Sequence, residues 1–183
     1  MSVTSGHEEA AASLIFSCPR AEAVFPGAGV RLSAEVPAVL LLDEHGGTFV
    51  LRVEGLKVME APGPEAESGV RLEVALPPAP ALIAGIESFA ARHRLPLAPG
   101  SPAPEMALRP TLAACHVPGQ NLFVYSEDSQ LEVRPKDGPP LKITVTGTFK
   151  TRPVPCREAD VVVHLSRSEM ARLLSYLLSL VRA

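Results

Sequence analysis

The strongest constraint on the fold is an internal repeat. Residues 14–60 align without a gap on residues 106–152, at an offset of 92 residues. Only seven of these 47 positions are identical, but the alternation of apolar and polar residues follows the same pattern in both halves. A one-residue slip would turn a strand inside out, so a matched pattern supports common ancestry better than the identities do. We therefore interpret the chain as a tandem duplication.

The aligned stretches predict strands, and each half closes with one more strand and a helix. In the first half these are residues 70–76 and 79–93, and in the second half 159–165 and 167–182. The earlier strands of the second half are expected at about 111–117, 121–126, 129–135 and 140–152. The paired apolar positions are Val30 with Leu122, Val39 with Leu131, Leu41 with Val133, Phe49 with Leu141 and Val53 with Val145.

Tight turns separate these strands and predict hairpins at Pro118-Gly119, Glu127-Asp128 and Asp137-Gly138. Ser166 and Glu169 form a capping box that begins the last helix. Sequential short strands form an antiparallel meander, which a single helix must cover on one face. The predicted fold class is α+β, with two tandem repeats, each an antiparallel β-meander of about five strands followed by one α-helix.

The domain organisation follows from the repeat and from a proline-rich segment at mid-chain. We expect a flexible N-terminus at 1–13, the first repeat at 14–94, a linker at 95–105 and the second repeat at 106–183. Apolar residues make up 46% of the chain, which excludes wholesale disorder. Trp is absent and aromatic residues are 4%, so the core is expected to consist of Leu, Val, Ala and Ile.

Charge and the N-terminal sequence limit the functional classes. The net charge of −3 argues against a general nucleic-acid or membrane-surface binder. No apolar run approaches the roughly 18 residues that span a bilayer. The first residues lack the basic and apolar regions of a signal peptide, so the sequence predicts an intracellular protein, with no membrane partner.

No motif in the sequence predicts catalysis, a cofactor or a metal site. Cys18, Cys115 and Cys156 share no metal-ligand spacing and are interpreted as buried thiols. His116 and His164 lie in predicted strands without a suitably spaced nucleophile or carboxylate, which favours structural roles. We therefore expect the chain not to be an enzyme.

The candidate binding surface is a basic row on the longest strand of the second half. Ile143, Val145 and Phe149 should face inward, and the even positions outward. Residues 93–183 carry 11 basic and 8 acidic residues, whereas residues 1–92 carry 6 and 12. Such a row, interleaved with aromatic rings, suits nucleic acid or an acidic peptide, and a solvated sheet face is the alternative. The predicted partner-binding residues are Lys142, Lys150, Arg152, Arg134, Phe123 and Tyr125.

The C-terminal helix has a wider apolar arc than one sheet face requires. Its apolar positions run from Met170 to Val181, and only a narrow polar stripe remains. Two explanations stay open: the helix is buried between the two repeats, or it forms a partner surface, such as the interface of a homodimer.

The strand and helix order resembles the tandem polo-box region of polo-like kinases. The resemblance rests on the segment Leu122–Val133, followed by Leu141–Val145, Val161–Leu165 and the helix Glu169–Ala183. The His and Lys with which polo-like kinases hold phosphopeptides correspond to Asp128 and Gln130 here. The pattern is therefore more similar to the divergent polo boxes of centriolar and kinetoplastid kinetochore kinases, which serve in targeting and assembly.

A second resemblance leads to a different function. The segment Gln130–Val145 and the strand-to-helix junction at 73–86 are similar to a PUR repeat, a unit of four strands and a helix that binds single-stranded DNA or RNA. The extra strand per unit and the negative net charge make this the alternative. We thus expect a non-catalytic scaffold that recruits a protein partner at a kinetochore- or centriole-type assembly, in the nucleus or at a cytoskeletal organelle.

Overall fold

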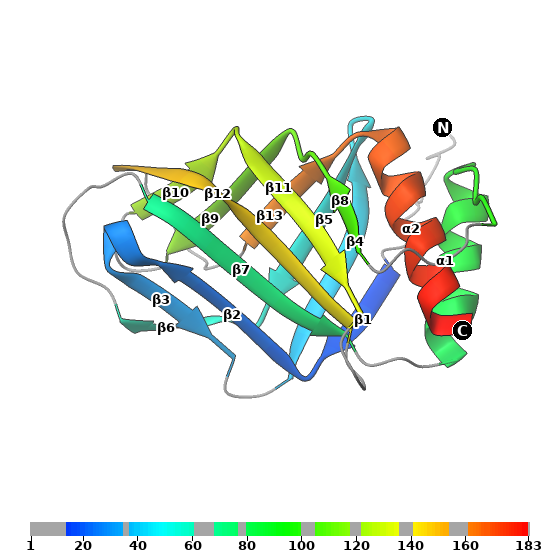
Figure 1. The fold of residues 1–183 in the computed structure, drawn as a ribbon, viewed down its shortest axis with the longest axis horizontal. Coiled ribbons are helices and arrows are strands. Elements are labelled where there is room, and N and C mark those ends of the chain that lie inside the picture. Colours follow the sequence, from blue (N-terminus) through cyan, green and yellow to red (C-terminus); the bar gives the residue numbers. More distant parts are fainter. Residues whose placement is uncertain are drawn as a thin grey trace, which may run out of the picture.

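The computed structural model describes residues 14–34, 37–60, 68–76, 80–99, 105–117, 122–135, 141–153 and 161–182. Within these ranges, thirteen strands form one continuous antiparallel sheet, accompanied by two α-helices (Figure 1). The elements in chain order are β1 (Leu14–Cys18), β2 (Arg20–Phe25), the 3-10 turn η1 (Pro26–Ala28), β3 (Val30–Ser33), β4 (Ala38–His45), β5 (Thr48–Glu54), β6 (Lys57–Glu60), β7 (Ser68–Leu76), α1 (Pro80–Arg92), β8 (Met106–Leu108), β9 (Leu112–Val117), β10 (Leu122–Ser126), β11 (Ser129–Arg134), β12 (Leu141–Pro153), β13 (Val161–Leu165) and α2 (Arg167–Arg182).

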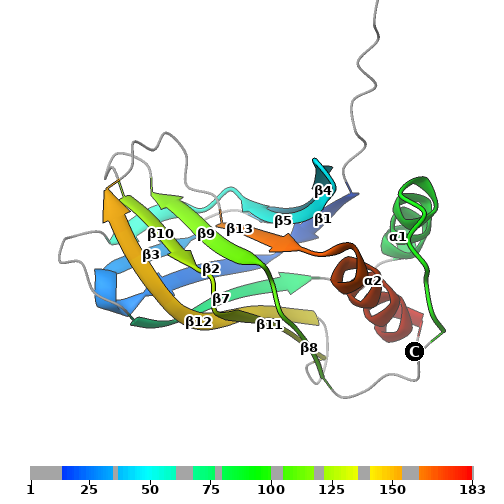
Figure 2. The same ribbon diagram turned by 90° about the horizontal axis from the view of Figure 1, so that it is seen from above.

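The sheet curls into two facing layers (Figure 2). The first layer has the strand order β1-β4-β5-β13-β9-β10, and the second has the order β8-β11-β12-β7-β2-β3-β6. The long strand β12 joins the layers, because its C-terminal end pairs with β10 while its first part lies between β7 and β11.

The predicted fold class, two tandem repeats with a meander and a helix each, is wrong. The strands of each half are divided between both layers, and within each layer strands from opposite halves pair with each other. Val53 on β5 lies opposite Val161 on β13, and Val74 on β7 lies opposite Ile143 on β12. Alternation along a strand determines which side chains are buried but not which strand lies beside it, so the sequence pattern fitted either arrangement.

The strand pairings recur when the two halves are exchanged. The pair β1–β4 corresponds to β8–β11, β4–β5 to β11–β12, and β5–β13 to β12–β7. Likewise β13–β9 corresponds to β7–β2, β9–β10 to β2–β3, and β10–β12 to β3–β6. The halves are therefore intertwined rather than placed side by side.

The gapless alignment of the halves is one residue out of register over β4. Leu40 and Leu42 are buried, whereas Val39 and Leu41 lie on the outer face. Their aligned counterparts in the second half, Leu131 and Val133 on β11, are buried. The segment 38–42 is apolar at every position, so its alternation could not reveal the slip.

Strands β10 and β11 do not form the predicted hairpin at Glu127-Asp128. Both lie along the same edge of β12, with Tyr125 opposite Lys150 and Ser129 opposite Gly147. The chain advances four residues from Tyr125 to Ser129 while β12 advances only three residues from Gly147 to Lys150. The edge formed by β10 and β11 therefore contains a β-bulge with one extra residue. A Cβ atom at Gly147 would lie 2.8 Å from the carbonyl oxygen of Asp128, which explains the glycine there.

The prediction that each helix covers a sheet face is wrong. The two helices instead pack together at one end of the layers (Figures 1 and 2). The start of α2 is as predicted, because the backbone N–H of Glu169 donates to Ser166 Oγ at 3.3 Å. Helix α2 contacts α1, β8, β13 and β5, and these contacts on several sides account for its wide apolar arc. Its buried residues are Met170, Ala171, Leu173, Leu174, Tyr176, Leu177 and Leu178.

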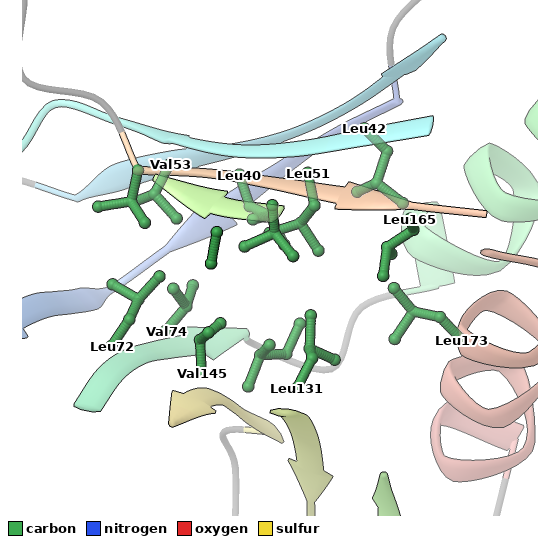
Figure 3. Close-up of a cluster of buried hydrophobic side chains, with 14 of the residues drawn as sticks. Leu40, Leu42, Leu51, Val53, Leu72, Val74, Leu131, Val145, Leu165 and Leu173 are labelled. Atoms are coloured by element: carbon green, nitrogen blue, oxygen red, sulfur yellow. The ribbon is translucent and has the colours of Figure 1, made fainter. Parts of the chain in front are cut away.

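The core lies between the layers and is made mainly of aliphatic side chains. Figure 3 shows Leu40, Leu51 and Val53 from the first layer facing Val74 and Val145 from the second. Leu173 of α2 points toward Leu165 where the helices close the end of the core. Burial of each such side chain contributes about 1.5–3 kcal/mol, so this core holds both outer faces in fixed positions.

Candidate functional site

Strand β12 follows its predicted alternation toward its C-terminal end, whereas Thr144, predicted to face outward, is buried. Ile143, Val145 and Phe149 are buried, and Lys150 and Arg152 are exposed. The predicted basic row, however, does not stay together as one surface. Its members lie at the two ends of β12, where they have different neighbours.

At the N-terminal end of β12, the basic side chains are neutralised by glutamates. Lys142 Nζ lies 2.5 Å from a carboxylate oxygen of Glu73, and the Lys142 side chain is only 14% exposed. Arg134 Nε lies 3.1 Å from Glu105, and its Nη2 lies 2.9 Å from Glu132. A charge reversal at Lys142 would therefore break this ion pair and place a second carboxylate beside Glu73.

At the C-terminal end, Arg152 lies over two stacked aromatic rings. The rings of Phe123 and Tyr125 are 5.5 Å apart with an interplanar angle of 12°. The Arg152 guanidinium carbon lies 5.0 Å from the Phe123 centroid and 4.9 Å from the Tyr125 centroid. His116 packs edge-on against Phe123 at 4.6 Å. We call His116, Phe123, Tyr125, Lys150 and Arg152 the Arg152 cluster.

Strand register explains why these five side chains meet. Phe123 lies opposite both His116 and Arg152, and Tyr125 lies opposite Lys150. Directly opposed residues on one sheet face are close enough for ring and cation–π contacts, which contribute about 0.5–1 kcal/mol at exposed sites. His116 was missed by sequence reasoning, because a two-residue turn at Pro118-Gly119 would have placed Ala114 opposite Phe123, whereas the strands pair His116 with Phe123.

Arg152 has no carboxylate partner within the part of the chain that the structure describes. Arg20 and Arg31 pair with Glu22, Arg52 pairs with Glu54, and Arg134 pairs with two glutamates. Among the described residues, the contacts that position the Arg152 guanidinium are those with the two rings, and they leave its N–H groups able to donate to another molecule.

A cavity of about 400 Å³ adjoins the Arg152 cluster at the β-bulge. The backbone N–H of Asp128 donates to Ser126 Oγ at 3.2 Å and shapes this turn. The cavity brings two acidic side chains next to a ring and an amine of the cluster. Its lining residues are Tyr125, Ser126, Glu127, Asp128, Thr148 and Lys150.

The outer faces of the two layers differ in chemistry. On the second layer, ion pairs link charged side chains of β2, β3, β7, β11 and β12. On the first layer, strand register places one row of residues across neighbouring strands, most of them apolar. We call this the outer row: Ile15, Leu41, Arg52, Val162, Ala114 and Tyr125.

Exposure within the outer row is greatest at the edge of the sheet. Ile15 is 63% exposed, and Leu41 and Val162 are half-buried. Tyr125 belongs to both the outer row and the Arg152 cluster, so the two lie on one face of the layer, although Ala114 between Tyr125 and Val162 is buried.

The described cysteines, and His164 among the histidines considered from the sequence, are buried or partly buried. Burial raises the pKa of Cys18 to about 12, Cys115 is also buried, and Cys156 lies outside the described residues. Partial burial, and then the charge of His45, lower the pKa of His164. No cluster of three or more His, Cys, Asp or Glu side chains suited to a metal occurs among the described residues. Nor is any described helix long and apolar enough to cross a membrane.

Comparisons with known proteins give no family. No family model matches the chain, and no curated protein matches it. Among solved structures, the chain is similar to the C-terminal receptor-binding domain of the avian reovirus fibre protein sigmaC. That similarity has 13% identity and a TM-score of 0.28, and covers 86% of this chain and 76% of the viral one.

Proposed function

We propose that this chain is a non-catalytic protein-interaction and targeting module whose partner docks on the outer face of the first layer. The observation that supports this most is the contrast between the two outer faces. The second layer carries ion pairs that link neighbouring strands, whereas the first has Ile15 exposed at its edge and half-buried Leu41 and Val162 in the same row as Tyr125, next to Arg152, which lacks an acidic partner among the described residues.

The energetics of protein interfaces favour this face. A continuous exposed apolar surface with a polar rim is typical of an interaction site. Tyr and Arg are the residue types that most often dominate interface energies. Because strand pairing fixes the positions of Tyr125 and Arg152, little ordering on this side opposes binding. The proposal therefore keeps Phe123, Tyr125, Lys150 and Arg152 as partner-binding residues, and leaves Lys142 and Arg134 to their ion pairs.

Site-specific photo-crosslinking tests the docking face. The full chain would carry p-benzoylphenylalanine in place of Leu41 on the first layer or, as the matched control, in place of Gln130 on the second. We expect crosslinks to a specific protein from position 41 and none from position 130. Equal crosslinking from both positions, or none from position 41, would contradict the proposal.

Targeting is the second part of the proposal. Recruitment to a kinetochore- or centriole-type assembly is what the polo-box resemblance implies, and imaging of the tagged full chain tests it. We expect discrete nuclear or cytoskeletal foci that are lost when Tyr125 and Arg152 are both replaced by Glu. Diffuse signal from the unaltered chain would contradict the targeting role.

Single-stranded nucleic acid is the second candidate partner. Lys150 and Arg152, exposed on one sheet face, favour it, since cations neutralise the phosphates of a nucleic acid. Titration of a labelled single-stranded oligonucleotide at increasing salt separates the two candidates. Binding that weakens steeply with salt supports nucleic acid, and no binding at physiological salt supports a protein partner.

A further inference from the structure

We infer that the Arg152 cluster binds a single carboxylate of an acidic peptide segment, with apolar residues of the same segment lying along the outer row. This inference rests on the proposed function, because it names the chemistry by which a docked protein is recognised. It draws on the geometry of Arg152, on the accessibility of the rings and on the charges around them.

Arg152 is arranged to receive a planar anion. Its guanidinium carbon lies about equally far from both ring centroids, at 5.0 and 4.9 Å, and its side chain is exposed. Packing over two rings restricts the rotation of the guanidinium, so fewer conformations are lost on binding. The in-plane N–H groups of a guanidinium match the two oxygens of a carboxylate.

The rings are poorly placed to stack with a nucleobase. Arg152 lies over both rings, and Phe123 is only 8% exposed. A base could stack on Tyr125 only by displacing the guanidinium that would hold its phosphate. The aromatic pair therefore serves to position the arginine rather than to bind a base.

The surrounding charges favour a group with one negative charge. Glu127 and Asp128 line the cavity that Tyr125 and Lys150 share with the cluster, and both carboxylates are exposed. These carboxylates repel a polyanion, and they repel a phosphate group more strongly than a carboxylate, because phosphate carries about −1.5 to −2. Of the other predicted basic residues, only Lys150 lies in the cluster, where its charge opposes two carboxylates, since Lys142 and Arg134 are already paired with glutamates elsewhere.

The apolar neighbours determine what should flank the carboxylate. Beyond Tyr125, the outer row continues through Ala114 and Val162 to Arg52, which is paired with Glu54, and then to Leu41 and Ile15. In a peptide segment with apolar residues on either side of an acidic residue, the acidic side chain would meet Arg152 and an apolar neighbour would meet the outer row.

Titration of the full chain with four probes, followed by the arginine Nε–Hε resonances in NMR spectra, tests the inference. The first is the blocked pentapeptide Gly-Leu-Glu-Leu-Gly, and two others replace its Glu by Gln or by phosphoserine. The fourth is a single-stranded oligo(dT) of twelve nucleotides. We expect the Glu peptide to shift the Arg152 resonance and to bind at least about tenfold more tightly than the other three.

Variants of the chain distinguish recognition from general charge attraction. Arg152→Lys keeps the charge but loses the paired donors, so we expect at least about a tenfold loss of affinity for the Glu peptide. Arg134→Lys on the second layer is the matched control and should bind like the unaltered chain. Thermal melts of both variants verify that they fold.

The inference is overturned if the Gln peptide binds as well as the Glu peptide, if phosphoserine or oligo(dT) binds more tightly, or if Arg152→Lys keeps its affinity. Failure of the proposed function is seen separately, as the absence of crosslinks from position 41. If position 41 gives crosslinks but Arg152→Lys binds the Glu peptide as tightly as the unaltered chain does, the docking face is supported and carboxylate recognition by Arg152 is contradicted.

Discussion

Gly147 shows how one residue shapes the candidate site. It lies opposite Ser129, next to the β-bulge, and a side chain there would meet the Asp128 carbonyl oxygen at 2.8 Å and Ser129 Cα at 2.9 Å. Both contacts are with backbone atoms, which cannot swing aside as a flexible side chain can. The bulge in turn places Glu127 and Asp128 beside Tyr125 and Lys150.

Replacing Gly147 by Ala should therefore lower the free energy of unfolding by about 1–3 kcal/mol, the usual cost of overpacking. Urea denaturation measures this, with Thr148→Ala as the control at the adjacent exposed position. The control should stay within about 0.5 kcal/mol of the unaltered chain. An unchanged stability of Gly147→Ala would show that the bulge relaxes freely.

Protonation of His164 makes the stability of the fold depend on pH. Its pKa is lowered by partial burial and by the neighbouring His45, so the folded chain takes up this proton at lower pH than the unfolded chain does. The stability that neutral His164 contributes is present above the unfolded pKa of about 6.5 and is lost as pH falls through the lower folded value. We expect His164→Gln to weaken the fall in stability between about pH 7 and 5, as measured by denaturation at each pH. An unaltered pH profile would contradict this.

At the scale of elements, the two helices are joined by an arginine. Arg167 begins α2, and its Nη2 donates to the carbonyl oxygens of His93 at 2.7 Å and Arg94 at 2.6 Å, just beyond the end of α1. A cation at this position satisfies carbonyl groups that have no partner within the helix.

Arg167→Ala should lower the free energy of unfolding by about 1 kcal/mol, because charge-assisted bonds are lost at an exposed site. Arg172→Ala is the control on the same helix, where the bond to Glu169 at 3.5 Å should contribute only about 0.3–0.5 kcal/mol. Thermal or urea denaturation compares them. Equal losses would mean that the link between the helices adds nothing.

The sequence predicted the elements better than their arrangement. The strand positions of the second half and the beginning of α2 are confirmed, because alternation and capping residues act locally. Of the candidate site, the outward direction of Lys150 and Arg152 is confirmed. The pairing of Lys142 with Glu73 could not be predicted, since it depends on β7 and β12 lying side by side although 60 or more residues separate them.

The intertwined halves make the whole molecule one cooperative unit. Strands β1, β4 and β5 complete a layer with β13, β9 and β10 of the other half, and β8, β11 and β12 do so with β7, β2, β3 and β6. A half on its own would lose the pairings β5–β13 and β7–β12 and expose the apolar strands that they cover. Repeats that stood side by side would not have this dependence, because each would contain a complete core.

We therefore expect the fragments 1–99 and 105–183 not to fold as monomers when each is made alone. Each should be unfolded, or should fold only by pairing with a second copy of itself, because the missing strands have counterparts within the same half. When mixed, the fragments should assemble into a one-to-one complex with the strand content of the intact chain. Circular dichroism and light scattering at several concentrations measure both results. A monomeric fragment with a cooperative unfolding transition would show that one half contains a complete core, contrary to the sheet order found here.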